Sequence, residues 1–130
     1  MKVEISNYDD PRVGPHERFI SVEIDNHDTW DLFTTLGEVI LPALKKFKEK
    51  NIGGVNVANE DLPEQLHSET SWHVRWDYIL DKMIWAFENV LDDEWEFDLY
   101  NEDRNLYEEK HKEIQKGLEL FGKYYRDLWI

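Results

Sequence analysis

The apolar residues between positions 72 and 91 recur every three or four residues, which is the spacing of one face of an α-helix. No proline or glycine interrupts this stretch. Because so continuous an apolar stripe needs cover from other elements, the pattern predicts a central helix over residues 72–91 on which the other helices pack. Its expected core residues are Trp72, Trp76, Ile79, Leu80, Met83, Ile84 and Phe87.

The same period marks two further helices. The first is expected over residues 28–50, after a cluster of helix-capping residues at positions 25–29. Pro42 lies inside it and has no N–H to donate, which predicts a kink or a break at that point. The second is expected over residues 105–129, where Gly117 and Gly122 lower the helix propensity and indicate close approach of a neighbouring helix.

Residues 2–8 and 18–24 instead alternate between apolar and polar, and turn-forming residues separate them. This predicts a β-hairpin over residues 1–24, which is marginally stable alone and is therefore expected to lie on the helices. Residues 51–71 and 92–104 show no clear period and are expected to be loops. The predicted fold is α+β in a single domain, residues 1–130, with an N-terminal two-stranded antiparallel hairpin packed on a bundle of three main α-helices.

The charge of the chain restricts its partners. It has 29 acidic and 15 basic residues, a formal net charge of -14, and most of the excess lies in residues 51–100. Such a field repels phosphate backbones, so direct nucleic-acid binding is disfavoured. The charge serves either solubility alone or docking to a basic partner, as a mimic of nucleic acid.

Cysteine content and hydropathy restrict the cellular location and the kinds of metal site that we expect. The chain has no cysteine, which excludes disulfides and thiolate metal sites. No segment has the pattern of a signal peptide or the length of a membrane span. We therefore expect no membrane association and a cytoplasmic location.

Catalytic and metal-binding motifs are weak. Glu108 and His111 form one Glu-x-x-His, half of what a di-iron bundle requires. Acids at helical spacing give only a faint signal for a magnesium-dependent nucleotide pyrophosphohydrolase, at Glu88, Asp92, Asp93, Glu109 and Glu113. No Gly-x-Ser-x-Gly or phosphate-binding glycine loop is present. The sequence predicts no catalytic residue, no metal and no cofactor, and a binding role rather than an enzyme.

Aromatic and basic residues on the helices point to binding of a small molecule. Tyr78 and Trp85 are seven residues apart and lie together off the main apolar stripe. Arg75 forms either an internal ion pair or a contact with a ligand carboxylate or phosphate beside aromatic rings, which suits a nucleotide. The C-terminal residues repeat this combination. The predicted ligand-binding residues are Arg75, Tyr78, Trp85, Tyr125 and Arg126.

An acidic and aromatic segment offers a different kind of binding. Residues 92–103 contain seven acids, four large apolar residues and no base. Aromatic anchors in an acidic rim suit a basic protein surface; alternatively, the segment is an exposed loop whose Trp95 and Phe97 are tucked into the core. The predicted partner-binding residues are Asp92, Asp93, Glu94, Trp95, Glu96 and Phe97.

Four segments together resemble a family of small proteins of tailed bacteriophages. They are Asp28-Thr29-Trp30, residues 40–44 (ILPAL), residues 75–88 (RWDYILDKMIWAFE) and residues 117–129 (GLELFGKYYRDLW). The similarity covers most of the chain from Asp25 onward. It brings no catalytic residues with it, and it implies expression in the cytoplasm of an infected bacterial host.

Three functions fit these features. The first is a counter-defence factor that sequesters a nucleotide-type signal in an aromatic and basic pocket. The second is an inhibitor of a basic host protein that acts through the acidic surface, and the third is an accessory of virion assembly. A homo-oligomer is expected in each case, because three helices carry more apolar surface than one small bundle hides.

Overall fold

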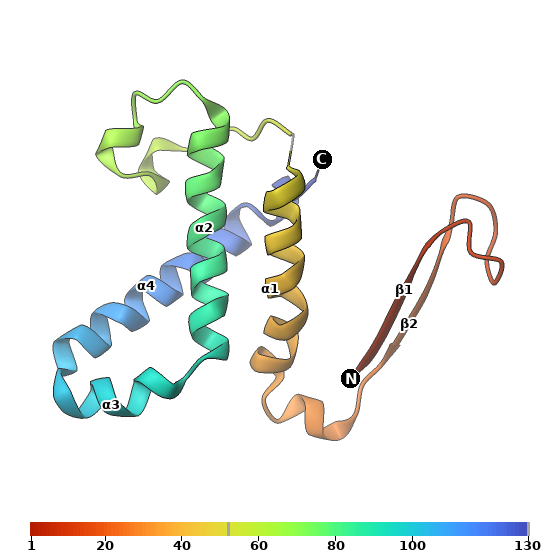
Figure 1. Cartoon of the computed structure of the whole chain (residues 1–130), viewed down its shortest axis with the longest axis horizontal. Coiled ribbons are helices and arrows are strands. Elements are labelled where there is room, and N and C mark those ends of the chain that lie inside the picture. Colours follow the sequence, from red (N-terminus) through yellow and green to blue (C-terminus); the bar gives the residue numbers. More distant parts are fainter. Residues whose placement is uncertain (52, 130) are drawn as a thin grey trace. The chain divides into compact units, whose positions relative to one another are not determined.

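Figure 1 shows the computed structural model, which describes residues 1–51 and 53–129. It confirms the α+β class and the N-terminal antiparallel hairpin, which is followed by four helices rather than three. The chain divides into two compact units, residues 1–36 and the residues from 37 onward. The expected packing of the hairpin on the helices stays a prediction. None of the described helices is both long and apolar enough to cross a lipid bilayer.

The hairpin of the first unit consists of β1 (Lys2–Tyr8) and β2 (Arg18–Glu23). Val3 pairs with Val22 and Ile5 with Ile20, so these β-branched side chains share one face of the hairpin. Within residues 1–36 no element covers this face, and all four side chains are exposed. The unit thus presents an apolar surface rather than burying it.

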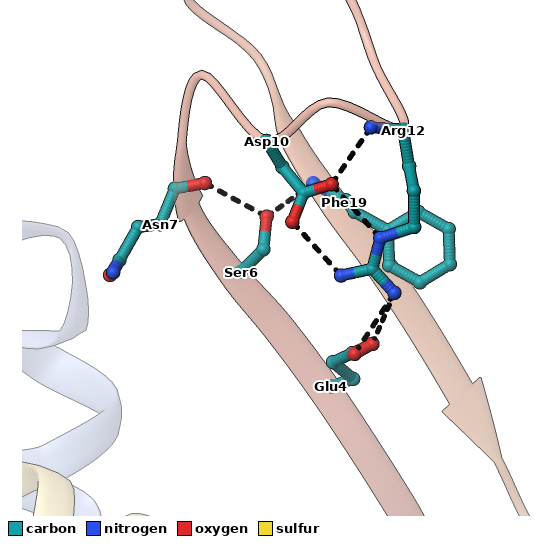
Figure 2. A network of polar contacts seen from close by, with 6 residues as sticks. All are labelled: Glu4, Ser6, Asn7, Asp10, Arg12 and Phe19. Carbon is teal, nitrogen blue, oxygen red and sulfur yellow. Dashed lines mark hydrogen bonds and ion pairs between the residues drawn. The ribbon is translucent and has the colours of Figure 1, made fainter.

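A network of polar contacts organises the loop between the strands (Figure 2). The Arg12 guanidinium donates to Asp10 at 2.9 Å and to Glu4 at 2.7 Å, and its Cζ lies 3.8 Å from the centre of the Phe19 ring. Hydrogen bonds from the Arg12 side chain and backbone lower the pKa of Asp10 to about 2. Because these contacts connect the loop to both strands, they fix its conformation.

The hairpin leads into a short 3-10 turn, Asn26–Thr29, rather than directly into the first helix. Asp25 and Asp28 form a capping box, and the N-terminal ammonium contacts Asp28 at 2.6 Å. The helix α1 (Leu32–Lys50) therefore begins four residues later than expected. It continues through Pro42 without a break, and the kink predicted there stays a prediction.

The second unit is built around α2 (Trp72–Leu91), which packs against α4 (Arg104–Lys123; Figure 1). Trp76, Ile79, Leu80 and Met83 are 0% exposed, which confirms the predicted core of the central helix. Phe87 is buried as well, while Trp72 and Ile84 pack at the edge of this core.

Residues 92–104 do not form the predicted loop. They contain a further helix, α3 (Glu94–Glu102), which packs on α4. Helix formation here is favoured by acids in the first turn, which complement the positive end of the helix dipole. The Asp103 carboxylate then caps α4, because it accepts from the N–H groups of Asn105 and Leu106 at 3.1 Å. At its other end, α4 stops at Lys123 and is followed by a 3-10 turn, Tyr125–Asp127.

The predicted loop over residues 51–71 is confirmed as irregular in its described part, residue 52 lying outside the described residues. It contains two 3-10 turns, Asn59–Asp61 and Glu64–Leu66. Its apolar side chains join the helical core, since Val55, Val57 and Leu62 are buried. The loop is therefore part of the packed structure of the second unit.

Candidate functional site

The acids and aromatic rings of α3 line an open hollow of about 340 Å³. We call it the α3 hollow; its residues are Asp93, Glu96, Phe97, Tyr100 and Tyr107. Phe97 is 76% exposed, an unusual environment for a phenylalanine side chain. The hollow thus places a solvent-exposed ring beside two carboxylates.

The structure separates the two aromatic residues predicted to bind a partner. The half-buried Trp95 packs against α4, with its ring centre 5.2 Å from that of His111 and 4.1 Å from Nζ of Lys110. Its Nε1 lies 3.4 Å from the carbonyl oxygen of Asn89. Trp95 is therefore held within the fold, whereas Phe97 is displayed to solvent.

Most carboxylates of the segment 92–103 have no basic partner. Of its seven acids, only Glu96 makes an ion pair within the described part of the chain, and this contact is 3.9 Å from His111 Nε2. Nearly half of the other acids of the protein lie in ion pairs. The negative charge around the α3 hollow is thus largely uncompensated.

A second hollow, of about 390 Å³, lies over α2 and α4. We call it the α2 hollow; its residues are Tyr78, Asp81, Lys82, Trp85 and Glu113. Two predicted ligand-binding residues, Tyr78 and Trp85, meet here. Lys82 Nζ lies 5.4 Å from the centre of the Tyr78 ring and 3.8 Å from Glu113, while Lys48 pairs with Asp81. Two acids and two bases therefore balance the charge.

Arg75 is engaged inside the protein. Its Nη1 donates to the Leu66 carbonyl at 2.8 Å, and its Nη2 donates to the Val57 carbonyl at 2.6 Å and to Asn59 Oδ1 at 2.8 Å. The internal ion pair that the sequence offered for Arg75 does not form among the described residues, because the guanidinium group donates to carbonyl oxygens instead. Contact with a ligand stays a prediction.

The remaining predicted ligand residues lie near the C-terminus. Tyr125 lines an apolar hollow of about 290 Å³, with residues of α1, α4 and the following turn: Val39, Ile40, Ala43, Leu44, Phe47, Phe121 and Leu128. Arg126 is the next residue of the same turn. The five predicted ligand residues are thus distributed over three places.

Sequence reasoning missed Lys82 and the polar contacts of Tyr124. Lys82 could have been found, because a residue four positions after Tyr78 and three before Trp85 shares their helix face. The Tyr124 hydroxyl donates to Asp61 and accepts from the Ala58 N–H at 3.1 Å. Lys123 Nζ also contacts Asp61, at 2.7 Å. No sequence pattern connects residues so far apart in the chain.

These contacts shift the titration of Asp61 and Tyr124. Burial alone would raise the pKa of the Asp61 carboxyl, but hydrogen bonds from Lys123 and Tyr124 outweigh it and lower the pKa below 3.8. Burial, reinforced by the hydrogen bond to Asp61, raises the pKa of the Tyr124 hydroxyl. Asp61 is therefore a carboxylate near neutral pH and connects the loop to α4.

Among residues 1–51 and 53–129, no three side chains of His, Asp or Glu are grouped so that they could hold a metal ion. No protein-family model, no curated protein sequence and no solved structure matches this chain. The functional assignment therefore rests on the chemistry of the surfaces described above.

Proposed function

We propose that this protein binds a basic partner protein through the α3 hollow and the acids around it. The observation that supports this function best is the Phe97 side chain, 76% exposed among carboxylates most of which have no basic partner within the described part of the chain. An exposed aromatic anchor in a polar rim is typical of a protein-binding surface. Uncompensated negative charge favours a positively charged partner and accelerates its association.

Surfaces that bind nucleic acid are basic, so a nucleic-acid-binding protein fits the description of this partner. By covering the partner's basic surface, the protein acts as an inhibitor that competes with nucleic acid. Because of the resemblance to a bacteriophage family, we expect the partner to be a protein in the cytoplasm of the bacterial host. The acidic surface of this protein repels nucleic acid itself, because both carry negative charge.

Capture from host lysate with two matched variants tests this function. One variant carries Asp93→Asn, Glu96→Gln and Asp98→Asn on α3. The control carries Glu108→Gln, Glu109→Gln and Glu119→Gln, exposed acids of α4 for which no ion pair occurs among the described residues. Both lose three negative charges, so a difference between them reports on position rather than on net charge.

The expected result is a basic protein, identified by mass spectrometry, that the wild type and the control retain and the α3 variant loses. Addition of nucleic acid should displace this protein. Equal retention by the α3 variant and its control would contradict the proposed function.

The α2 hollow supports a second candidate function, sequestration of a nucleotide-type molecule. Its specific support is that Tyr78, Trp85 and Lys82 lie around one hollow, which provides rings for stacking and one ammonium group. Because Asp81 and Glu113 balance the local bases, this site favours the base and sugar over a highly charged phosphate chain.

Native mass spectrometry of protein purified gently from cells with active antiviral defences tests the second candidate. Retained nucleotide should appear as a stoichiometric mass adduct that is lost in Trp85→Leu and kept in Phe97→Ala, which alters only the other hollow. An adduct that survives Trp85→Leu would exclude the α2 hollow, and wild-type protein without any adduct would count against sequestration.

A further inference from the structure

The α3 hollow has the chemistry of a receptor for a cationic side chain. It is open, with a volume of about 340 Å³, and it combines the rings of Phe97, Tyr100 and Tyr107 with the carboxylates of Asp93 and Glu96. We infer that this hollow binds the guanidinium group of an arginine presented by the partner. The inference rests on the proposed function and names the group that the acidic surface recognises.

Two aromatic rings, Tyr100 within the hollow and Trp95 next to it, already hold cations of this protein on their faces. Cζ of Arg104 lies 3.7 Å from the centre of the Tyr100 ring, and Nζ of Lys110 lies 4.1 Å from the centre of the Trp95 ring. No cation occupies the Phe97 ring among residues 1–51 and 53–129. The Phe97 face is thus available for the stacking that its neighbours show.

Both carboxylates of the hollow retain free acceptor positions. The Asp93 side chain has no hydrogen bond or ion pair in the described part of the chain. The contact of Glu96 with His111, at 3.9 Å, is too long for a hydrogen bond. Asp93 and Glu96 lie three residues apart and face the same hollow, so one planar group can reach both.

This arrangement favours arginine over lysine. A guanidinium group is flat, stacks on a ring and donates several hydrogen bonds in its own plane, whereas an ammonium group is a compact and strongly hydrated charge. Phe97 provides the ring, and the two carboxylates provide acceptors beside it. The same carboxylates repel a phosphate or carboxylate ligand.

The probes are three capped amino acids, the N-acetyl amides of arginine, lysine and citrulline, titrated into the protein with residues 1–130 and followed by NMR. Citrulline has nearly the shape of arginine but no charge. We expect the arginine probe to shift the resonances of Phe97 and Tyr100 at millimolar concentrations, and the citrulline and lysine probes to bind about tenfold more weakly.

A matched pair of variants locates the binding. Glu96→Gln removes a carboxylate of the hollow, while Glu94→Gln removes one from the same helix outside the hollow. We expect Glu96→Gln and Phe97→Ala to weaken arginine binding about tenfold and Glu94→Gln to leave it within about twofold. Both Glu96 and Phe97 lie outside the core, so the variants should fold like the wild type.

Equal shifts with the citrulline or lysine probe, or arginine binding that is unchanged by Glu96→Gln, would overturn the inference. Failure of the proposed function looks different. If the arginine probe binds the hollow but no basic protein is captured, the inferred arginine site is supported and the proposed function is not. If a basic protein is captured while the arginine and lysine probes bind alike and more tightly than the citrulline probe, the acidic surface acts through charge alone.

Discussion

Gly117 lies where α4 comes closest to α2. A Cβ atom at this position would be 2.5 Å from the Cβ of Ala86 and 2.6 Å from the carbonyl oxygen of Lys82. Both neighbours belong to the packed centre of the second unit and cannot move without disturbing it. Gly117→Ala should therefore lower the free energy of unfolding by about 1–3 kcal/mol, despite the better helix propensity of alanine, as measured by urea denaturation.

Gly122 is the matched control in the same helix. Outside the local helix backbone and the two chain neighbours, no atom of the described residues lies within 4 Å of a Cβ added there, so Gly122→Ala should gain helix propensity without steric cost and stabilise the protein by up to about 1 kcal/mol. The close approach that the sequence indicated is thus present at Gly117 and not at Gly122. Equal stability of the two variants would contradict the assigned role of Gly117.

Asp61 connects the loop to α4 in a pH-dependent way. Its pKa is lower in the folded protein than the ordinary 3.8, so it contributes stability above that pH, and this contribution is lost as the pH falls through the folded-state pKa. We expect thermal unfolding below about pH 4 to show a steeper loss of stability for the wild type than for Asp61→Asn. Parallel loss in both proteins would show that other acids account for the effect.

At the scale of elements, the loop over residues 53–71 depends on Arg75. One guanidinium group serves three acceptors in the loop, the Val57 and Leu66 carbonyls and the Asn59 side chain. Replacing it leaves the part-buried Val57 and Leu66 carbonyls without this partner, at a cost of up to about 1–3 kcal/mol for each, whereas the exposed Asn59 side chain can turn to water. Arg75→Met keeps part of the aliphatic stem and should destabilise the loop selectively.

Hydrogen exchange measures this effect by segment. We expect faster exchange in residues 53–71 of Arg75→Met and unchanged protection in α2 and α4. Lys110→Met is the control: it removes the ammonium group from the face of the Trp95 ring and should leave exchange of the loop unchanged. Unaltered exchange of the loop in Arg75→Met would contradict the anchoring role.

The elements differ in how far sequence predicted them. The helix over residues 72–91 was predicted with its bounds, because its apolar period is long and its interior is free of glycine and proline. The helix α3 was missed, since nine residues with alternating acids and rings show no clear stripe. Its helical form depends on packing against α4, a tertiary contact that local pattern does not contain.

The candidate surfaces were predictable only in part. Tyr78 and Trp85 were paired correctly, because helical spacing alone places them on one face. The separation of Trp95 from Phe97 was not predictable, since it depends on which face of α3 contacts α4. Arg75 could be recognised as a candidate for an internal role, but its carbonyl acceptors come from a loop without any period.

At the scale of the whole molecule, the first unit does not bury much of its apolar surface within itself. Ten of the 17 exposed large hydrophobic side chains among residues 1–51 and 53–129 lie within residues 1–36, including Trp30 at 74% and Phe33 at 64% exposed. Burying them would contribute on the order of 10 kcal/mol per copy, enough to offset the cost of association when both copies take part. We therefore predict self-association through the first unit.

Ionic strength should separate this contact from capture of a basic partner. Each copy carries a net charge of -14, so added salt screens the repulsion between copies and strengthens their association. The same salt weakens attraction between the α3 hollow and a basic protein. Light scattering coupled to size exclusion, at several protein and salt concentrations, is expected to show an oligomer that grows more stable as salt rises.

A double variant in the hairpin tests where the copies meet. Ile5→Thr with Ile20→Thr makes one cross-strand pair polar but keeps β-branched residues, so the hairpin should persist while the oligomer weakens by at least about tenfold. Val74→Ala with Leu106→Ala changes exposed apolar residues of the second unit and should leave the oligomer intact. A wild type that stays monomeric at every concentration would contradict self-association and would favour the alternative in which the hairpin packs on the helices of its own chain.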